Sequence, residues 1–115
     1  MKAFRIYLVA VIVCLYAYTM MVGLNHGWNL LPTFFGDMLA MTWPGQFNAD
    51  FMSFLMLSGL WLAWRHRFSP GGLALGVLGI FGGMAVLAPY LLYASYQANG
   101  DARVLLLGKA NAAAN

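Results

Sequence analysis

The sequence predicts an all-α membrane protein, a bundle of three transmembrane helices with a short interfacial helix in its first extracytoplasmic connection. Three observations predict this fold. Hydrophobic residues make up 63% of the 115 residues and charged residues only 8%, whereas a soluble domain carries about 25% charged residues. Long apolar runs reach the length that crosses a bilayer as a helix. The basic residues gather beside these runs, where they set the orientation of a membrane protein.

The first apolar run covers residues 6–24 and contains no charged residue. As a helix it measures about 28 Å, close to the thickness of the hydrocarbon layer. Lys2 and Arg5 precede it, as basic residues also precede the core of a signal peptide. A signal core is shorter, however, and a cleavage site with small residues follows it. The run therefore predicts an uncleaved transmembrane helix.

Two further runs, residues 47–64 and 71–94, predict the second and third spans, with a Ser-Pro-Gly turn at 69–71 before the third. Asn48 has a side chain suited to cap the start of the second span. We expect residues 1–98 to form a single transmembrane domain. Residues 99–115 read as a short, polar, flexible tail.

The connection between the first two spans, residues 25–46, contains no Lys or Arg. Its apolar part holds Pro32 and Asp37 and is too short to cross the bilayer. Trp28 and Trp43 flank this part, and tryptophan favours the headgroup level. We therefore expect a short helix over residues 33–41 that lies on the membrane surface.

The basic residues predict the orientation. Lys and Arg in short loops remain in the cytoplasm. Three spans place Lys2 and Arg5 on the same side as Arg65 and Arg67, whereas four spans would separate the two pairs. The sequence therefore predicts a multi-pass protein with a cytoplasmic N-terminus and an extracytoplasmic C-terminus.

Four glycines of the third span, spaced by four, three and four residues, fall on one helix face: Gly72, Gly76, Gly79 and Gly83. Small residues let helix backbones approach closely, which stabilises helix pairs in lipid. The spacing predicts a helix-packing seam. Its partner helix belongs either to the same chain or to another copy.

Polar residues from all three spans and from the first connection are expected near the outer membrane surface: Asp50, Tyr90, Tyr93, Thr19 and, in the connection, His26. Two interpretations of this layer stay open. In the first, Asp50 only complements the dipole at the start of its helix. In the second, Asp50 points into the bundle and, with the tyrosines, binds a cation, a proton or a polar ligand.

Methionines are also frequent in the predicted outer half of the protein, and thioether sulfur suits Cu(I). A copper site is one interpretation, and ordinary packing of flexible side chains is the other. The candidate residues are Met38, Met41, Met52 and Met56. The sequence contains no other metal-ligand set, no nucleotide-binding loop and no nucleophile–base pair. We therefore expect no catalytic residues, no cofactor and no enzymatic activity.

Four segments of the chain together resemble a known pattern: 31–35 (LPTFF), 47–50 (FNAD), 61–65 (WLAWR) and 89–93 (PYLLY). Over about residues 5–97 the chain resembles a family of small three-span bacterial inner-membrane proteins, known as a domain of unknown function. The resemblance implies a location in the cell inner membrane of a bacterium. It implies no activity.

The sequence favours an accessory or scaffold subunit whose helices pack on partner helices or on other copies of the chain. The alternative is an oligomeric transport or ligand-binding component built on the outer Asp/Tyr layer. Expected partners are the lipid bilayer and either a membrane protein or a second copy. The formal net charge of +3 is too small for a nucleic-acid-binding surface.

Overall fold

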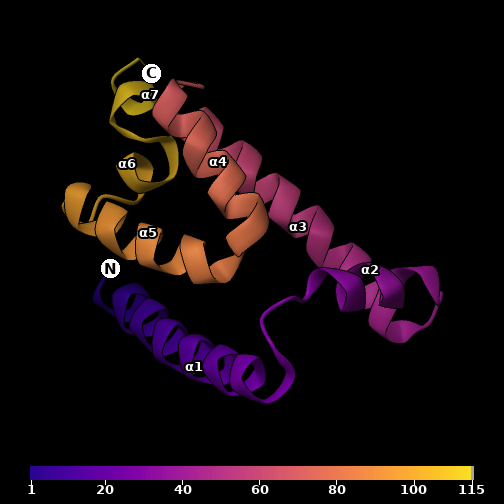
Figure 1. Ribbon diagram of the computed structural model, residues 1–115. Coiled ribbons are helices and arrows are strands. Elements are labelled where there is room, and N and C mark those ends of the chain that lie inside the picture. The colour runs from indigo at the N-terminus through magenta and orange to yellow at the C-terminus, as the bar shows by residue number, and fades with distance from the viewer. Residues whose placement is uncertain (115) are drawn as a thin grey trace.

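The computed structural model describes residues 1–114, and these residues form helices with no strand among them. Figure 1 shows the seven helices of this part: α1 (Lys2–His26), α2 (Leu31–Leu39), α3 (Trp43–Arg65), α4 (Pro70–Gly82), α5 (Met84–Gln97), α6 (Ala102–Leu107) and α7 (Lys109–Ala114). The predicted all-α class is therefore confirmed.

Helix α1 is, within the part that the structure describes, the one helix with both the length and the hydropathy of a membrane span. Its 25 residues include a stretch of mean hydropathy 2.1, and only 11% of that stretch is buried in the protein. Helix α3 is nearly as long, with 23 residues. Polar residues in its first two turns, such as Gln46 and Asp50, lower its hydropathy.

Helices α3 and α4 form an antiparallel hairpin. The hydroxyl of Ser69 accepts a hydrogen bond from the backbone N–H of Gly72 and so caps α4, with Pro70 at its first turn. Buried glycines of α4 face α3, and a Cβ added at Gly76 would come within 2.8 Å of the carbonyl oxygen of Gly59. The glycine face of α4 therefore packs inside this chain, against Gly59, Leu62 and Ala63.

The segment predicted as a third span, residues 71–94, differs from that prediction because it consists of two helices. Gly83 separates them with φ 57° and ψ −139°, a backbone conformation that essentially only glycine adopts. Its Cα also lies close to α3, since an added Cβ would be 3.1 Å from side-chain atoms of Phe51 and Leu55. At this corner the chain reverses, and α5 runs back toward the end of the molecule where α3 ends (Figure 1).

Helices α1 and α5 pack side by side in opposite directions. Near one end, the guanidinium of Arg5 donates to the hydroxyl and to the carbonyl oxygen of Ser95, both at 2.9 Å. Eleven residues further along α1, the Tyr16 hydroxyl donates to the carbonyl oxygen of Ala85. Pro89, which has no backbone N–H, leaves this carbonyl without its helical donor. Tyr16 therefore replaces a hydrogen bond that the proline removes.

The start of α3 differs from the sequence prediction. The helix begins at Trp43, with Thr42 at the N-cap position, so Asn48 lies inside the helix and does not cap it. The side-chain amide of Asn48 instead donates to the carbonyl oxygen of Phe34 at 3.1 Å. This hydrogen bond joins α3 to α2, the helix predicted over 33–41.

The C-terminal segment is folded over residues 102–114, where the sequence predicted a flexible tail; residue 115 lies outside the described residues. Leu105 of α6 forms a small core with Ala94 and Ala98 at the end of α5, and Phe4 of α1 packs against it. Helices α6 and α7 thereby lie at the end of the molecule that also holds the N-terminus (Figure 1).

Candidate functional site

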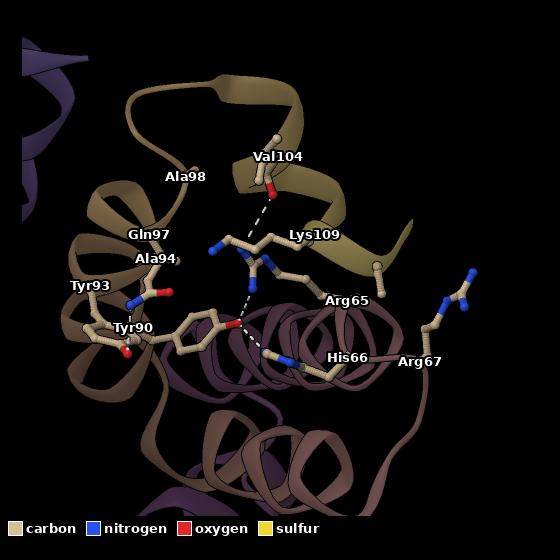
Figure 2. Close-up of a pocket in the computed structure, with 12 residues that line it drawn as sticks. Arg65, His66, Arg67, Tyr90, Tyr93, Ala94, Gln97, Ala98, Val104 and Lys109 are labelled. Atoms are coloured by element: carbon tan, nitrogen blue, oxygen red, sulfur yellow. Dashed lines mark hydrogen bonds between the residues drawn. The ribbon is translucent and has the colours of Figure 1, made fainter. Parts of the chain in front are cut away.

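A cavity of about 450 Å³ lies where the end of α3, the second half of α5 and the α6–α7 segment meet. Figure 2 shows the side chains that line it. Its polar and charged lining residues are Arg65, His66, Arg67, Tyr90, Tyr93, Gln97 and Lys109.

Arg65, the last residue of α3, forms the back of this cavity and is only 8% exposed. Its Nε donates to the carbonyl oxygen of Leu105 at 2.8 Å and one terminal nitrogen to the Tyr90 hydroxyl at 2.7 Å. The other terminal nitrogen donates to the carbonyl oxygen of Val104 at 3.4 Å. All three acceptors are neutral oxygens. The guanidinium is therefore held in place while its charge is not neutralised.

The Tyr90 hydroxyl joins Arg65 to His66, because it also lies within hydrogen-bond distance of Nε2 of His66. Burial, with a smaller contribution from the neighbouring Arg65 charge, lowers the pKa of His66 below its usual range. A neutral His66 leaves one ring nitrogen free to accept a hydrogen bond. Arg65 then donates to the hydroxyl, and the hydroxyl donates to His66. The three side chains link the end of α3 to α5 (Figure 2).

The α6–α7 segment forms the remaining wall of the cavity and is bonded to α3. The indole N–H of Trp61 donates to the carbonyl oxygen of Leu106 at 3.0 Å. The Asn111 side chain donates to the carbonyl oxygen of Trp64 and accepts from Nε of Arg67, both at 3.1 Å. These bonds satisfy carbonyl groups at helix ends, which lack partners within their own helices.

Charge is distributed unevenly between the two ends of the molecule. All six Lys and Arg residues of the chain lie near the end that holds the cavity: Lys2, Arg5, Arg65, Arg67, Arg103 and Lys109. Asp101 is the one acidic residue near them among the described residues, and it caps α6 through the backbone N–H of Arg103. None of the described lining residues is acidic. The cavity therefore has a positive potential.

The predicted polar layer is not brought together. Tyr90 and Tyr93 line the cavity beside Arg65, whereas Asp50 is exposed and precedes Arg65 by 15 residues on α3, a separation of about 22 Å along the helix. The reversal of the chain at Gly83 is the physical reason, because it carries α5 away from the start of α3.

The other members of that layer, Thr19 and His26, are exposed on the second half of α1. The four methionines considered for copper lie on or near α2 and in α3, with Met38 and Met52 half-buried and Met41 and Met56 exposed. Among the described residues, no group of three or more His, Cys, Asp or Glu side chains is positioned to hold a metal ion.

Sequence patterns identified Arg65 and Arg67 as orientation signals but did not link them to Tyr90 or Lys109. The available signal was the Gly82-Gly83 pair followed by Pro89, because two adjacent glycines and a proline interrupt helices. A break there would have returned Tyr90 to the level of Arg65. Nothing in the sequence near Lys109 indicated that it lines the same cavity.

Comparison of the chain with protein-family models, with curated proteins and with solved structures finds no match. The function is therefore argued from the chemistry and the geometry of the chain itself.

Proposed function

We propose that the chain is an integral membrane protein in which α1 and α3 cross the bilayer and α4 and α5 form a re-entrant hairpin. Helices of 25 and 23 residues measure about 38 and 34 Å, enough for a hydrocarbon layer of about 30 Å. Helices α4 and α5 have 13 and 14 residues and measure only about 20 Å each. This arrangement takes the place of the third crossing that the sequence predicted.

The contacts of the α4–α5 corner support a position near the middle of the bilayer. Gly83 approaches Phe51 and Leu55, which lie about 15–21 Å from the end of α3. On the other side of the corner, Ala85 bonds to Tyr16, well inside α1. Irregular backbone at this depth is tolerated where protein covers it, and Gly83 is buried.

The distribution of basic residues also favours the re-entrant hairpin. Three continuous crossings would put Arg103 and Lys109 on the face opposite to Arg65. With α5 returning, every Lys and Arg of the chain falls on one face, which the positive-inside rule assigns to the cytoplasm. Both termini are then cytoplasmic. The resemblance described above supports a bacterial inner membrane.

Reporter fusions test this topology. We expect green fluorescent protein fused after residue 115 to fluoresce, and alkaline phosphatase inserted after Trp28 to be active, because the phosphatase folds only outside the cytoplasm. A C-terminal phosphatase fusion with full activity would contradict the re-entrant hairpin and restore three crossings.

Within the membrane, the protein acts as a non-enzymatic accessory or scaffold subunit whose helices pack on a partner protein or on a second copy. The supporting observation is that the chain covers little of its two longest helices, whose apolar faces are left free to meet lipid or another helix. Helix α1 packs mainly against α5, and its outer side exposes residues such as Ile6, Val13 and Leu24. Helix α3 exposes Phe54 and Leu57 in the same way.

Co-purification in a mild detergent tests the scaffold function. A photo-crosslinking residue in place of Phe54 is expected to capture a partner helix or a second copy. The matched control is the same residue in place of Leu78, which is similarly exposed but lies on α4. A monomer that captures nothing from either position in native membranes would contradict this function.

A ligand-binding role is the second candidate, and the cationic cavity favours it. The sequence placed such a role on the outer layer around Asp50. The cavity instead offers a site at the opposite end of the molecule, near Arg65.

A further inference from the structure

We propose that the cavity at the end of α3 binds a phosphate group, carried either by an anionic lipid headgroup or by a small soluble phosphate. The lipid source rests on the membrane placement proposed above, whereas the chemistry of the cavity does not depend on it.

Arg65 carries a buried positive charge that the protein does not neutralise. A guanidinium has five N–H donors, and three hydrogen bonds from Arg65 reach protein oxygens. A buried charge without an opposite charge is costly. The remaining donors and the uncompensated charge therefore favour an anion beside Arg65.

Two cationic side chains come together in the cavity, because the Lys109 side chain extends across Arg65 toward α5 (Figure 2). Arg67 also belongs to the cavity lining, but its side chain points away from this pair. Like charges repel each other, more strongly away from bulk water. No described lining residue supplies a negative charge. A bound anion would offset this repulsion.

The donors of the cavity suit phosphate better than other anions. The planar fork of arginine matches the spacing of two phosphate oxygens, which makes bidentate contacts favourable. Neutral donors lie on the α5 side of the cavity, where the amide of Gln97 donates to the Tyr93 hydroxyl at 3.0 Å and leaves the hydroxyl hydrogen available. A cavity of about 450 Å³ is within the range of small-molecule sites and larger than a bare ion requires.

The position of the cavity relative to the membrane indicates the source of the phosphate. The proposed membrane placement sets the end of α3 at the level of the cytoplasmic headgroups. Trp61 and Trp64 lie in its last two turns, as tryptophan does at membrane interfaces. Anionic lipids are enriched at such a surface and attract basic residues. The lipid headgroup is therefore the principal source to test.

Native mass spectrometry of the full chain in a neutral detergent tests the site. The probes are phosphatidylglycerol, phosphatidylcholine and inorganic phosphate, each titrated separately. We expect one phosphatidylglycerol to be retained in preference to phosphatidylcholine, and Lys109→Gln to weaken that retention at least about tenfold, the effect of losing one charge-assisted contact.

The matched control is Arg103→Gln, which removes one positive charge from the same end of the molecule but lies outside the cavity. It should leave retention within about twofold of the unchanged protein. A loss of retention with Lys109→Gln but not with Arg103→Gln supports the site. The probe whose retention is lost, phosphatidylglycerol or inorganic phosphate, identifies the source of the phosphate. Equal loss of retention in both variants overturns the proposed site. The site is also overturned if the unchanged protein retains neither phosphatidylglycerol nor inorganic phosphate. Unchanged melting temperatures of both variants establish that the fold is intact.

The two proposals fail separately. Binding is measured in detergent, where the topology of the chain has no influence. An extracytoplasmic C-terminus in the fusion experiment would overturn the re-entrant hairpin and leave the phosphate site intact. Absence of binding together with a cytoplasmic C-terminus would overturn the phosphate site and leave the re-entrant hairpin intact.

Discussion

The hydroxyl group of Tyr90 helps to hold the end of α3 to α5, together with the edge-to-face contact between the Tyr90 and Trp61 rings. The hydroxyl accepts from a guanidinium that is almost fully buried and lies against a histidine ring. The individual types were visible in the sequence, but their contact spans 25 residues and depends on the direction in which α5 runs. Local patterns carry no information about that direction.

Tyr90→Phe is expected to lower the free energy of unfolding by about 1–3 kcal/mol, since it removes a hydrogen bond to a charged, buried group. Denaturant titration in detergent, followed by tryptophan fluorescence, measures this change. The control is Tyr93→Phe, at an exposed residue whose hydroxyl accepts a hydrogen bond from the uncharged side chain of Gln97, which should cost no more than about 0.5 kcal/mol. Equal costs would show that the Tyr90 hydroxyl does not stabilise the junction.

His66 should make stability depend on pH. Its pKa is lowered in the folded protein, so the unfolded chain takes up a proton first as the pH falls below about 6.5. The contribution of His66 to the free energy of unfolding is therefore complete above that pH and is lost as the pH falls through the lower pKa of the folded protein. The protonated ring would share the cavity with the positive charges of Arg65 and Lys109. His66→Gln should flatten the melting temperature between pH 7 and pH 5, and an unchanged slope would exclude His66 as its origin.

At the scale of helices, the sequence predicted where most of them occur but not how two of them are joined. Apolar length predicts α1 and α3 well. The glycines of α4 fit the predicted packing seam. Gly83 continues their helical spacing of four, three and four residues, so the pattern predicted one continuous helix and concealed the break between α4 and α5. Helices α6 and α7 are six residues each, too short to form without contacts to the rest of the protein. Such helices leave almost no signal in sequence.

Gly83→Ala tests the corner. A Cβ there meets Phe51 and Leu55 and imposes a backbone strain of about 1–3 kcal/mol. We expect a lower melting temperature and, where the strain straightens the chain, fusions that report a C-terminus outside the cytoplasm. Gly71→Ala is the matched control, because nothing lies within 4 Å of its added Cβ. Equal melting temperatures of the two variants would contradict a conformation restricted to glycine.

The α3–α4 contact gives a second test at this scale. Gly79→Leu should destabilise the protein by several kcal/mol, because an added Cβ already lies 2.7 Å from Leu62 of α3 and closely packed cores tolerate little extra volume. Leu78→Phe, on the exposed side of the same helix, should change stability by less than about 0.5 kcal/mol. Thermal unfolding in detergent compares the two. Similar losses would mean that the glycine face does not pack on α3.

The whole molecule is polarised along its length. Its basic residues lie at one end with both termini, and Asp37 and Asp50 lie toward the other, in or near α2 and the start of α3 (Figure 1). Composition alone predicted a helical protein with basic clusters, since those properties are sums over residues. Composition did not predict that Arg103 and Lys109 lie at the same end of the molecule as Lys2 and Arg5. Their position depends on the backbone conformation of Gly83, in the middle of the segment predicted as one helix.

The corner at Gly83 also has a consequence for biosynthesis. In the topology proposed above, neither half of the hairpin is long enough to cross the hydrocarbon layer on its own. Its insertion then depends on α1 and α3, which precede it in the chain and are synthesised first. The hairpin enters the bilayer as a pair received by these two helices, and not as two segments that insert independently.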